Sequence, residues 1–423
     1  MRFDFRRFDP KRPPAFVLGG LDLLPPLGFA GIPAIIATAD PREPARASRY
    51  CTGRCRLPDL ANRAAAADKL LATGEELLSA IGCRVPLLYG NDDALRLIHE
   101  HRNALSRYFL LLLNEPGLTR SLLEHYRFGA LARARGLPVP RMLSWAAAGA
   151  SALVRAEGPV IVKARDSLTP EEWPVFLRLL DGPGKARVFE NGRQVMAHPL
   201  ARQLKDRLAF QEYVCGTDSD LWSFHGFADQ RGRLLAWFTG RKLRTWPARA
   251  GMSSFLELAR HDELPAIGRD VAARLGLKGI FKINFKQGAR DGRFRVLGID
   301  ARYNLWHHVA AKNGVNLPRV AYDYLVHGER PARVEFRTSC RWVHFRLDYR
   351  AFRELEARKE LTPARWAWSL LASRKVYHLL SWTDPMPFLV RLFGRLKSWA
   401  RRGARHVALR LGRGRSTASL SKS

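Results

Sequence analysis

The sequence predicts an N-terminal α/β region with a parallel sheet, followed by an α+β region of antiparallel strands and helices. Two short apolar runs, Ala15–Gly20 and Gly31–Asp40, are spaced as in a strand–helix–strand unit. Two pairs of apolar stretches, within 221–239 and 279–300, each enclose a polar turn that indicates an antiparallel hairpin. With 423 residues, of which 47% are hydrophobic, the chain is long enough for two or three packed domains.

The remaining N-terminal elements follow from periodicity and from breaker residues. An alanine-rich stretch predicts a helix over Leu60–Ile81, and Val85–Tyr89 has the pattern of a buried strand. Helices are expected over 93–135 with a break at 114–117, and the Pro/Gly segment Gly136–Pro140 marks a boundary. Cys51 and Cys55 are expected in a loop, because no second Cys/His pair has the spacing of a metal site.

The middle of the chain alternates strands with turns and one helix. The predicted elements are the strands Gly158–Lys163 and Ala209–Gly216, the hairpin strands Leu221–Ala228 and Leu234–Thr239, the helix Glu263–Leu275, and the hairpin strands Gly279–Lys286 and Arg293–Asp300.

Positive charge gathers at the ends of these strands. Lysines or arginines close several strands, and one lies in a Gly/Pro loop: Lys163, Lys185, Lys242, Arg244, Lys286 and Arg302. Point charges beside a glycine-containing loop suit a polyphosphate. Any one of these cations could equally be a solvated surface residue. The prediction of a polyphosphate site therefore rests on all of them occurring at successive strand ends.

The order of these motifs resembles the ATP-grasp superfamily, in particular its carboxylate–amine ligases. The resemblance extends over residues 15–328, about three quarters of the chain, and is carried by five segments: Gly19–Gly20, Pro159–Lys163, Phe210–Val214, Gly240–Arg244 and Gly279–Pro318. The resemblance implies an ATP-dependent ligase that joins a carboxylic acid to an amine through an acyl phosphate. It also implies an N-terminal pre-ATP-grasp domain over 1–120 and an ATP-grasp domain over 121–330.

The resemblance also implies roles for individual residues. It implies Lys163 and Lys185 on the phosphates, Gln211, Glu212, Tyr213 and Val214 on adenine, Asp218 or Asp220 near the ribose, Arg302 on the transferred phosphoryl group, and Lys242 or Arg244 on the acid. ATP and Mg²⁺ are the expected cofactors.

The expected metal site departs from the family pattern. Family members place one carboxylate on the penultimate strand and Glu plus Asn on the last, whereas this chain has Asn284, Gly298 and Asp300. Asn284 and Asp300 are the remaining candidate ligands for Mg²⁺, which accepts one carboxylate when phosphates and water complete its shell. The alternative is a catalytically degenerate ATP-grasp protein that binds nucleotide without ligation.

A C-terminal extension is expected over 331–423. A strand is predicted at Trp342–Tyr349 and a helix at Leu361–Trp382, and the segment from 412 onward is expected to be disordered. Phe388–Arg402 has the pattern of a basic amphipathic helix, which either contacts an anionic membrane surface or packs on the domain with its basic side in water.

The net charge of +32 first suggests nucleic acid as a partner, yet the sequence contains no recognition motif for it, so this hypothesis ranks last. No apolar run approaches the ~18 residues of a membrane span, and Met1–Pro14 precedes no apolar signal segment. Five scattered cysteines fit reduced thiols, so a cytoplasmic protein, with possible association at the membrane surface, is expected. Of His307 and His308, at most one is expected to face the site.

Overall fold

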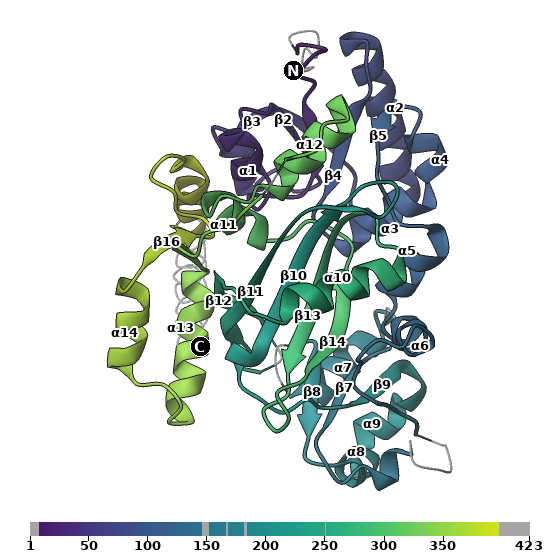
Figure 1. The fold of residues 1–423 in the computed structure, drawn as a ribbon, viewed down its shortest axis with the longest axis vertical. Helices are drawn as coiled ribbons and strands as arrows, with labels where there is room; N and C mark the ends of the chain where they lie inside the picture. Colours follow the sequence, from purple (N-terminus) through teal and green to yellow (C-terminus); the bar gives the residue numbers. More distant parts are fainter. Residues whose placement is uncertain are drawn as a thin grey trace, which may run out of the picture.

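The computed structural model describes residues 8–145, 152–165, 168–181, 184–249, 251–332 and 334–396, apart from the side chain of His125. Three sheets organise this part of the chain, and Figure 1 shows them one above another along the long axis. The predicted combination of a parallel N-terminal sheet with antiparallel sheets and helices is confirmed.

The N-terminal sheet has five parallel strands in the order β3-β2-β1-β4-β5. Its strands are β1 (Ala15–Leu18), β2 (Ala34–Thr38), β3 (Cys51–Arg56), β4 (Val85–Tyr89) and β5 (Phe109–Leu110), and its helices are α1 (Leu24–Phe29), α2 (Arg63–Ile81), α3 (Asp92–Glu100) and α4 (Arg102–Leu105). The expectation of a loop at Cys51 and Cys55 is wrong, because both residues lie on β3 at the sheet edge. Both thiols are free, and no group of three or more metal-binding side chains occurs among the described residues.

A small antiparallel sheet follows, in the order β6-β9-β7-β8. It contains β6 (Met142–Leu143), β7 (Val160–Ala164), β8 (Ala186–Phe189) and β9 (Leu208–Glu212), is preceded by α5 (Pro116–Leu123) and α6 (His125–Ala134), and is packed by α7 (Glu172–Leu180), α8 (Gly192–Ala197) and α9 (Pro199–Gln203). In Figure 1 this unit lies at the end of the molecule opposite the N-terminus.

The central sheet has seven strands in the order β14-β13-β10-β11-β12-β15-β16. The first five strands of this order, from β14 to β12, are β10 (Leu221–Ala228), β11 (Leu234–Trp246), β12 (Met252–Leu258), β13 (Gly279–Gln287) and β14 (Phe294–Asp300). The helices of this part are α10 (Leu264–Leu275), α11 (Trp306–Lys312) and α12 (Leu317–His327). Odd-numbered residues of β13, such as Phe281, Ile283 and Phe285, pack in the same core cluster as α10. The even-numbered residues therefore face the other side of the sheet.

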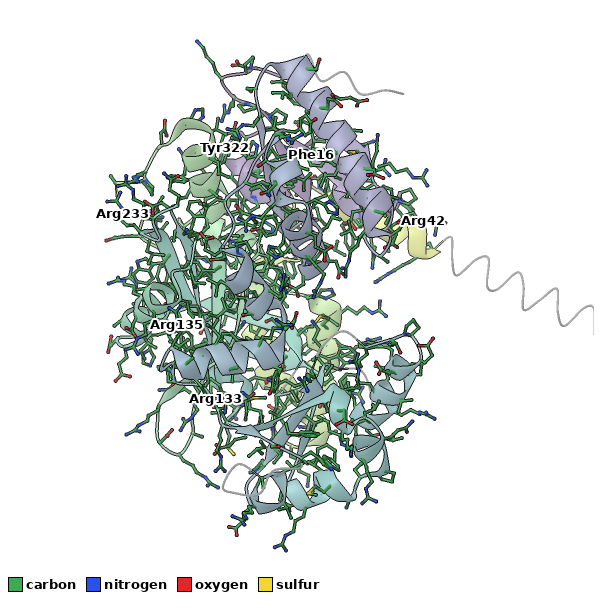
Figure 2. All side chains as sticks on the ribbon, turned by 90° about the vertical axis from the view of Figure 1, so that its right-hand side faces the viewer. Phe16, Arg42, Arg133, Arg135, Arg233 and Tyr322 are labelled. Atoms are coloured by element: carbon green, nitrogen blue, oxygen red, sulfur yellow. The ribbon has the colours of Figure 1, made fainter. Side chains whose placement is uncertain are left out.

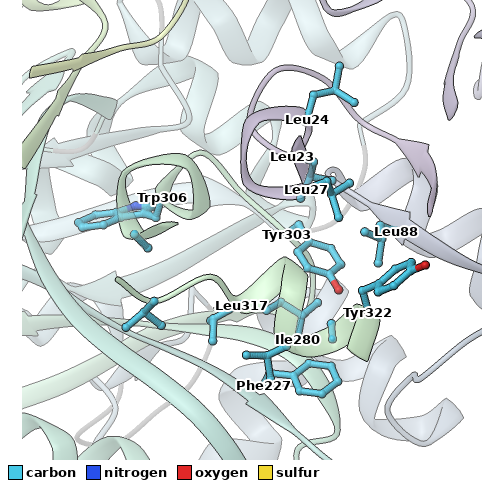
Figure 3. Close-up of a cluster of buried hydrophobic side chains, with 14 of the residues drawn as sticks. Leu23, Leu24, Leu27, Leu88, Phe227, Ile280, Tyr303, Trp306, Leu317 and Tyr322 are labelled. Atoms are coloured by element: carbon cyan, nitrogen blue, oxygen red, sulfur yellow. The ribbon is translucent and has the colours of Figure 1, made fainter. Parts of the chain in front are cut away.

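A second core cluster joins the N-terminal sheet to the central sheet. Figure 3 shows Leu27 of α1 and the N-cap residue Leu23 above Tyr303, with Phe227 and Ile280 of the central sheet below. The Tyr322 hydroxyl donates to the Pro13 carbonyl over 2.7 Å. This joint fixes the loops at the carboxyl ends of the N-terminal strands against the end of β14.

The C-terminal extension completes the central sheet. It contributes β15 (Cys340–Val343) and β16 (Arg374–Tyr377), together with α13 (Phe345–Ala357) and α14 (Pro363–Leu371). The expected strand at Trp342–Tyr349 is therefore wrong beyond Val343, where α13 begins, and the expected helix at Leu361–Trp382 gives way to β16. The sheet crosses the expected domain boundary near residue 330, and that boundary stays a prediction.

Residues 386–396 are helical and expose apolar and basic side chains together, including Phe393 and Arg395. The rest of the predicted basic helix, and the tail expected to be disordered, lie outside the described residues. Asp384, just before this helix, accepts hydrogen bonds from the Ser48 hydroxyl and from the Arg49 backbone N–H of the N-terminal region. Among the helices that the structure describes, none combines the length and the apolar character of a membrane span.

The basic residues are spread over the molecule. Figure 2 shows Arg42 and Arg233 far from Arg133 and Arg135, which lie at the C-terminal end of α6, and all four are exposed. The labelled aromatic residues Phe16 and Tyr322 are buried.

Candidate active site

A cavity of about 300 Å³ lies between the small antiparallel sheet and the central sheet. One wall comes from β7 and β9, and the other from β10, β11, β13 and β14. Side chains of α3 and α5 line it as well. The predicted residues that line it are Lys163, Lys185, Gln211, Glu212, Tyr213, Val214, Lys242, Asn284 and Asp300. The fold thus brings most of the predicted site together.

The segment Gln211–Val214 forms one side of the cavity. Its backbone is held in place, because the Glu212 N–H donates to the Arg141 carbonyl and the Tyr213 N–H donates to the Pro159 carbonyl. Lys286, on β13, donates from Nζ to the Tyr213 hydroxyl over 3.0 Å and to the Gly216 carbonyl over 3.2 Å. A flat aromatic base would find apolar side chains here, including Val214, Leu221 and Trp222.

Two buried lysines reach the cavity from opposite walls. Lys163 of β7 donates from Nζ to Gln211 Oε1 over 3.3 Å, and burial lowers its pKa to about 8. Burial, reinforced by the neighbouring Lys282, also lowers the pKa of Lys242 to about 8. Within the described part of the chain Lys242 has no hydrogen bond or ion pair, so its ammonium is available to an anion. Lys185 is exposed at the rim of the cavity.

The end of β14 carries the carboxylate of the site, and it is surrounded by donors. Asp300 Oδ2 lies 3.1 Å from Asn284 Nδ2 and 3.6 Å from Lys282 Nζ, while Oδ1 lies 3.4 Å from an Arg302 nitrogen. Burial disfavours the carboxylate, but Lys282 and Arg302 outweigh burial and hold the pKa of Asp300 below its ordinary value. Lys282 is a residue that the sequence-based prediction did not include.

Arg302 connects this cluster to the N-terminal region. Its Nε lies 2.6 Å from Oδ1 of Asp92, which begins α3 directly after the loop that follows β4. The guanidinium therefore bridges Asp92 and Asp300, two carboxylates that line the cavity, although Arg302 itself is not among the lining residues.

The chain was compared with known proteins at the level of sequence and of fold. No model of a known protein family matches the sequence. A curated relative, the D-aspartate ligase of Enterococcus faecium (strain Aus0004), is 21% identical over 267 residues, which are 60% of this chain. The match spans 61% of that relative's length.

Solved structures show the same architecture. L-amino acid ligase from Bacillus licheniformis superposes with a TM-score of 0.53 at 12% identity, over 75% of each chain. The ADP complex of N5-carboxyaminoimidazole synthetase from Staphylococcus aureus has a TM-score of 0.53 at 11% identity, over 76% of this chain and 79% of that chain. The chain has the ATP-grasp fold.

Four predicted residues are not among those that line the ATP-grasp cavity: Arg302, described above, and Arg244, Asp218 and Asp220. Arg244 is two residues after Lys242 and was expected beside it, but a β-bulge interrupts the pairing of β11 with β12 between them. Because the bulge breaks the alternation of faces, Arg244 points the other way and forms a buried two-bond ion pair with Asp348 of α13. The prediction that Arg244 faces the substrate is therefore corrected.

Asp218 and Asp220 also have structural partners instead of a place in the cavity lining. Asp218 is buried and accepts bonds from the Thr245 N–H, the Thr245 hydroxyl and the Arg249 N–H. Asp220 caps its own turn by accepting from the Thr217 N–H and hydroxyl. Neither carboxylate lines the ATP-grasp cavity.

His307 and His308 are both buried in α11, and neither lines the cavity. His307 packs against Phe238 and Tyr303, and His308 packs against Phe29. Burial lowers the pKa of each to about 3. These residues therefore serve the packing of α11 against the sheet.

The residues at the expected metal position do not fit a Mg²⁺ site. Asp300 is the one carboxylate among Asn284, Gly298 and Asp300, and a lysine ammonium already lies 3.6 Å from it. Mg²⁺ requires several oxygen ligands in octahedral geometry, whereas the neighbours of Asp300 are nitrogen donors.

Proposed function

We propose that this protein is an ATP-dependent carboxylate–amine ligase that binds ATP in the cavity between the two antiparallel sheets. The observation that carries the proposal is the convergence of Lys163, Lys185 and Lys242 on one cavity that also has apolar lining residues, among them Val214, Leu221 and Trp222. Apolar walls suit a base and clustered cations suit a triphosphate. The similar proteins give independent support, since they are two ligases and a synthetase.

The proposed reaction has two steps. A carboxylate oxygen of the acid attacks the γ-phosphorus of ATP, the bond to the β-phosphate oxygen breaks, and ADP leaves. The amine then attacks the acyl carbon, phosphate leaves, and loss of a proton from nitrogen gives the amide. The protein contributes position and charge: Lys163, Lys185 and Lys242 hold phosphate oxygens, and Arg302 stabilises the group in transfer.

The substrates are proposed to include an amino acid. D-aspartate ligase and L-amino acid ligase are the names of two of the relatives, and both name an amino acid. A carboxylate of such a substrate would be attracted to the net positive charge around Asp300, to which Lys282 and Arg302 contribute.

A second candidate is nucleotide binding without ligation. It is favoured by the single carboxylate at the end of β13 and β14. The two candidates are separated by measuring ADP release with pools of amino acids and amines, followed by mass spectrometry of the products. ADP release that depends on both an acid and an amine, with a new amide mass, supports the ligase. ATP binding without ADP release under every pool supports the second candidate.

A further inference from the structure

The pairing of β13 with β14 places a lysine where the ATP-grasp resemblance leads one to expect a divalent cation. In the antiparallel register, Asn284 lies opposite Gly298 and Lys282 lies opposite Asp300. Directly opposite residues share a face of the sheet. Both positions expected to bear the first two carboxylates are therefore uncharged, and the one carboxylate left is paired with an ammonium.

The contacts of Asp300 leave little for a metal ion. Oδ2 is approached by Asn284 Nδ2 and Lys282 Nζ, and Oδ1 is approached by Arg302. Lys282 is itself 92% buried, as its exposed fraction is 8%. On its other side its Nζ lies 6.0 Å from the centre of the Trp306 ring, so Asp300 is its ion-pair partner among the described residues. A divalent ion bound to Asp300 would lie close to this ammonium and be repelled by it.

Further cations of the chain surround the same cavity. Lys242 is next to this cluster on β11, and Lys163 reaches in from β7. The charges of Lys282, Arg302 and Lys242 all act on Asp300, while the other two carboxylates of the lining, Asp92 and Glu212, have arginine partners. A triphosphate would find here, from fixed side chains, the neutralisation that a metal ion otherwise supplies.

We propose, resting on the function proposed above, that Lys282 stands in place of the metal: it neutralises Asp300, and nucleotide phosphates bind the lysines of the chain directly, without a divalent cation held by the protein. Lys282 is a positioning residue in this scheme, because it acts through Asp300 and does not line the cavity. Without Lys282, the partly buried Asp300 would direct a negative charge without its lysine partner toward the phosphates, and Mg²⁺ would then stabilise the complex.

The test is titration calorimetry of the full chain with ATP, in EDTA and in MgCl₂. The unmodified protein is expected to bind ATP with dissociation constants within about threefold in the two buffers, since threefold is well below the tenfold step of one strong interaction. Lys282→Met is expected to weaken binding in EDTA about tenfold and to recover most of it in MgCl₂. Lys282→Arg keeps the charge and is expected to bind like the unmodified protein.

Two further variants serve as controls. Lys278→Met removes a lysine whose Nζ pairs with Glu115 outside the cavity, so it should leave ATP binding unchanged in both buffers. The double variant Lys282→Met/Asp300→Asn removes both charges, so it should restore ATP binding in EDTA. It also avoids leaving a partly buried carboxylate without its lysine partner, which would destabilise the single variant.

The outcomes are distinct. Equal binding in the two buffers, lost in Lys282→Met and regained in the double variant, supports the inference. Binding by the unmodified protein only in MgCl₂, abolished by Asp300→Asn, overturns the inference and leaves the proposed function intact. No ATP binding in either buffer overturns the proposed function itself, and the inference with it.

Discussion

The ion pair between Arg244 and Asp348 ties the C-terminal helices to the central sheet, and its removal gives a prediction of measurable size. Arg244 Nε and Nη2 donate to the two oxygens of Asp348 over 2.8 Å each, and the side chains are 7% and 0% exposed. Asp348 also accepts from Ser254 Oγ at 3.2 Å and from Trp366 Nε1 at 2.9 Å. Every neighbour of this carboxylate is therefore a donor.

The change to make is Asp348→Asn, which keeps the volume and removes the charge. The new amide NH₂ must face Arg244 or Trp366, both donors, and the guanidinium loses its counter-charge. Breaking a buried pair in this way costs about 3–5 kcal/mol. We expect the free energy of unfolding to fall by about 3 kcal/mol, the low end of that range, because the amide oxygen of Asn still accepts a hydrogen bond.

The assay is urea unfolding followed by tryptophan fluorescence, with the free energy of unfolding taken from the midpoint and slope. The matched control is Asp270→Asn, which breaks a half-exposed pair with Arg274 on α10 and is expected to cost less than about 0.5 kcal/mol. A loss below about 1 kcal/mol for Asp348→Asn would refute the reasoning. ATP affinity should be unchanged, and a parallel loss of affinity would return Arg244 to the substrate site.

The remaining predictions concern the cavity and the C-terminus. Because burial lowers the pKa values of Lys163 and Lys242 to about 8, ATP affinity should fall as the pH rises above about 8, with proton uptake on binding that calorimetry in two buffers detects. The free energy of unfolding should change in the opposite sense. Between about pH 8 and 10.5 the two lysines hold more protons in the unfolded chain, where their pKa is 10.5, than in the folded protein. Their contribution therefore favours the folded state more as the pH rises through that window, and denaturation at several pH values measures it. Arg302→Ala should abolish ATP turnover, measured as ADP release, with an unchanged circular dichroism spectrum; unchanged turnover would contradict the assignment. A chain that ends at Pro387 keeps the Asp384 contacts but lacks the basic helix, so it should no longer sediment with phosphatidylserine vesicles. Each missing positive charge is worth about 1 kcal/mol of binding free energy. Equal sedimentation of the shortened and the full-length chain would show that the helix does not contact the membrane.

Local pattern predicted the elements that hold the site, and long-range pairing decided what it missed. The strand Leu221–Ala228 and the helix at 263–275 are confirmed because alternation and helical period are written in the sequence itself. The two lysines of β13 were detectable as well, since Lys282, Asn284 and Lys286 alternate with apolar residues and must share a face. The pairing of Lys282 with Asp300 could not be predicted, because it depends on the register between β13 and β14.

Two errors have causes that no local pattern contains. The bulge between Lys242 and Arg244 turns the Arg244 side chain to the opposite face of the sheet. It arises from the pairing of β11 with β12, which the sequence around Arg244 does not reveal. The strands β15 and β16 were missed or misplaced because their partner strands are distant in the sequence. For example, Arg341 of β15 pairs with Glu257 of β12, which lies 84 residues earlier in the chain. A short strand with a distant partner has little signal of its own.

The late arrival of β15 and β16 has a consequence for synthesis. Until residue 343 has left the ribosome, β12 is an open edge whose residues from Ser253 to Leu258 are buried in the finished protein. An open, apolar edge is a template for pairing with another chain. A nascent or truncated chain that stops before Cys340 should therefore require a chaperone or aggregate, even though every residue lining the cavity has already been made.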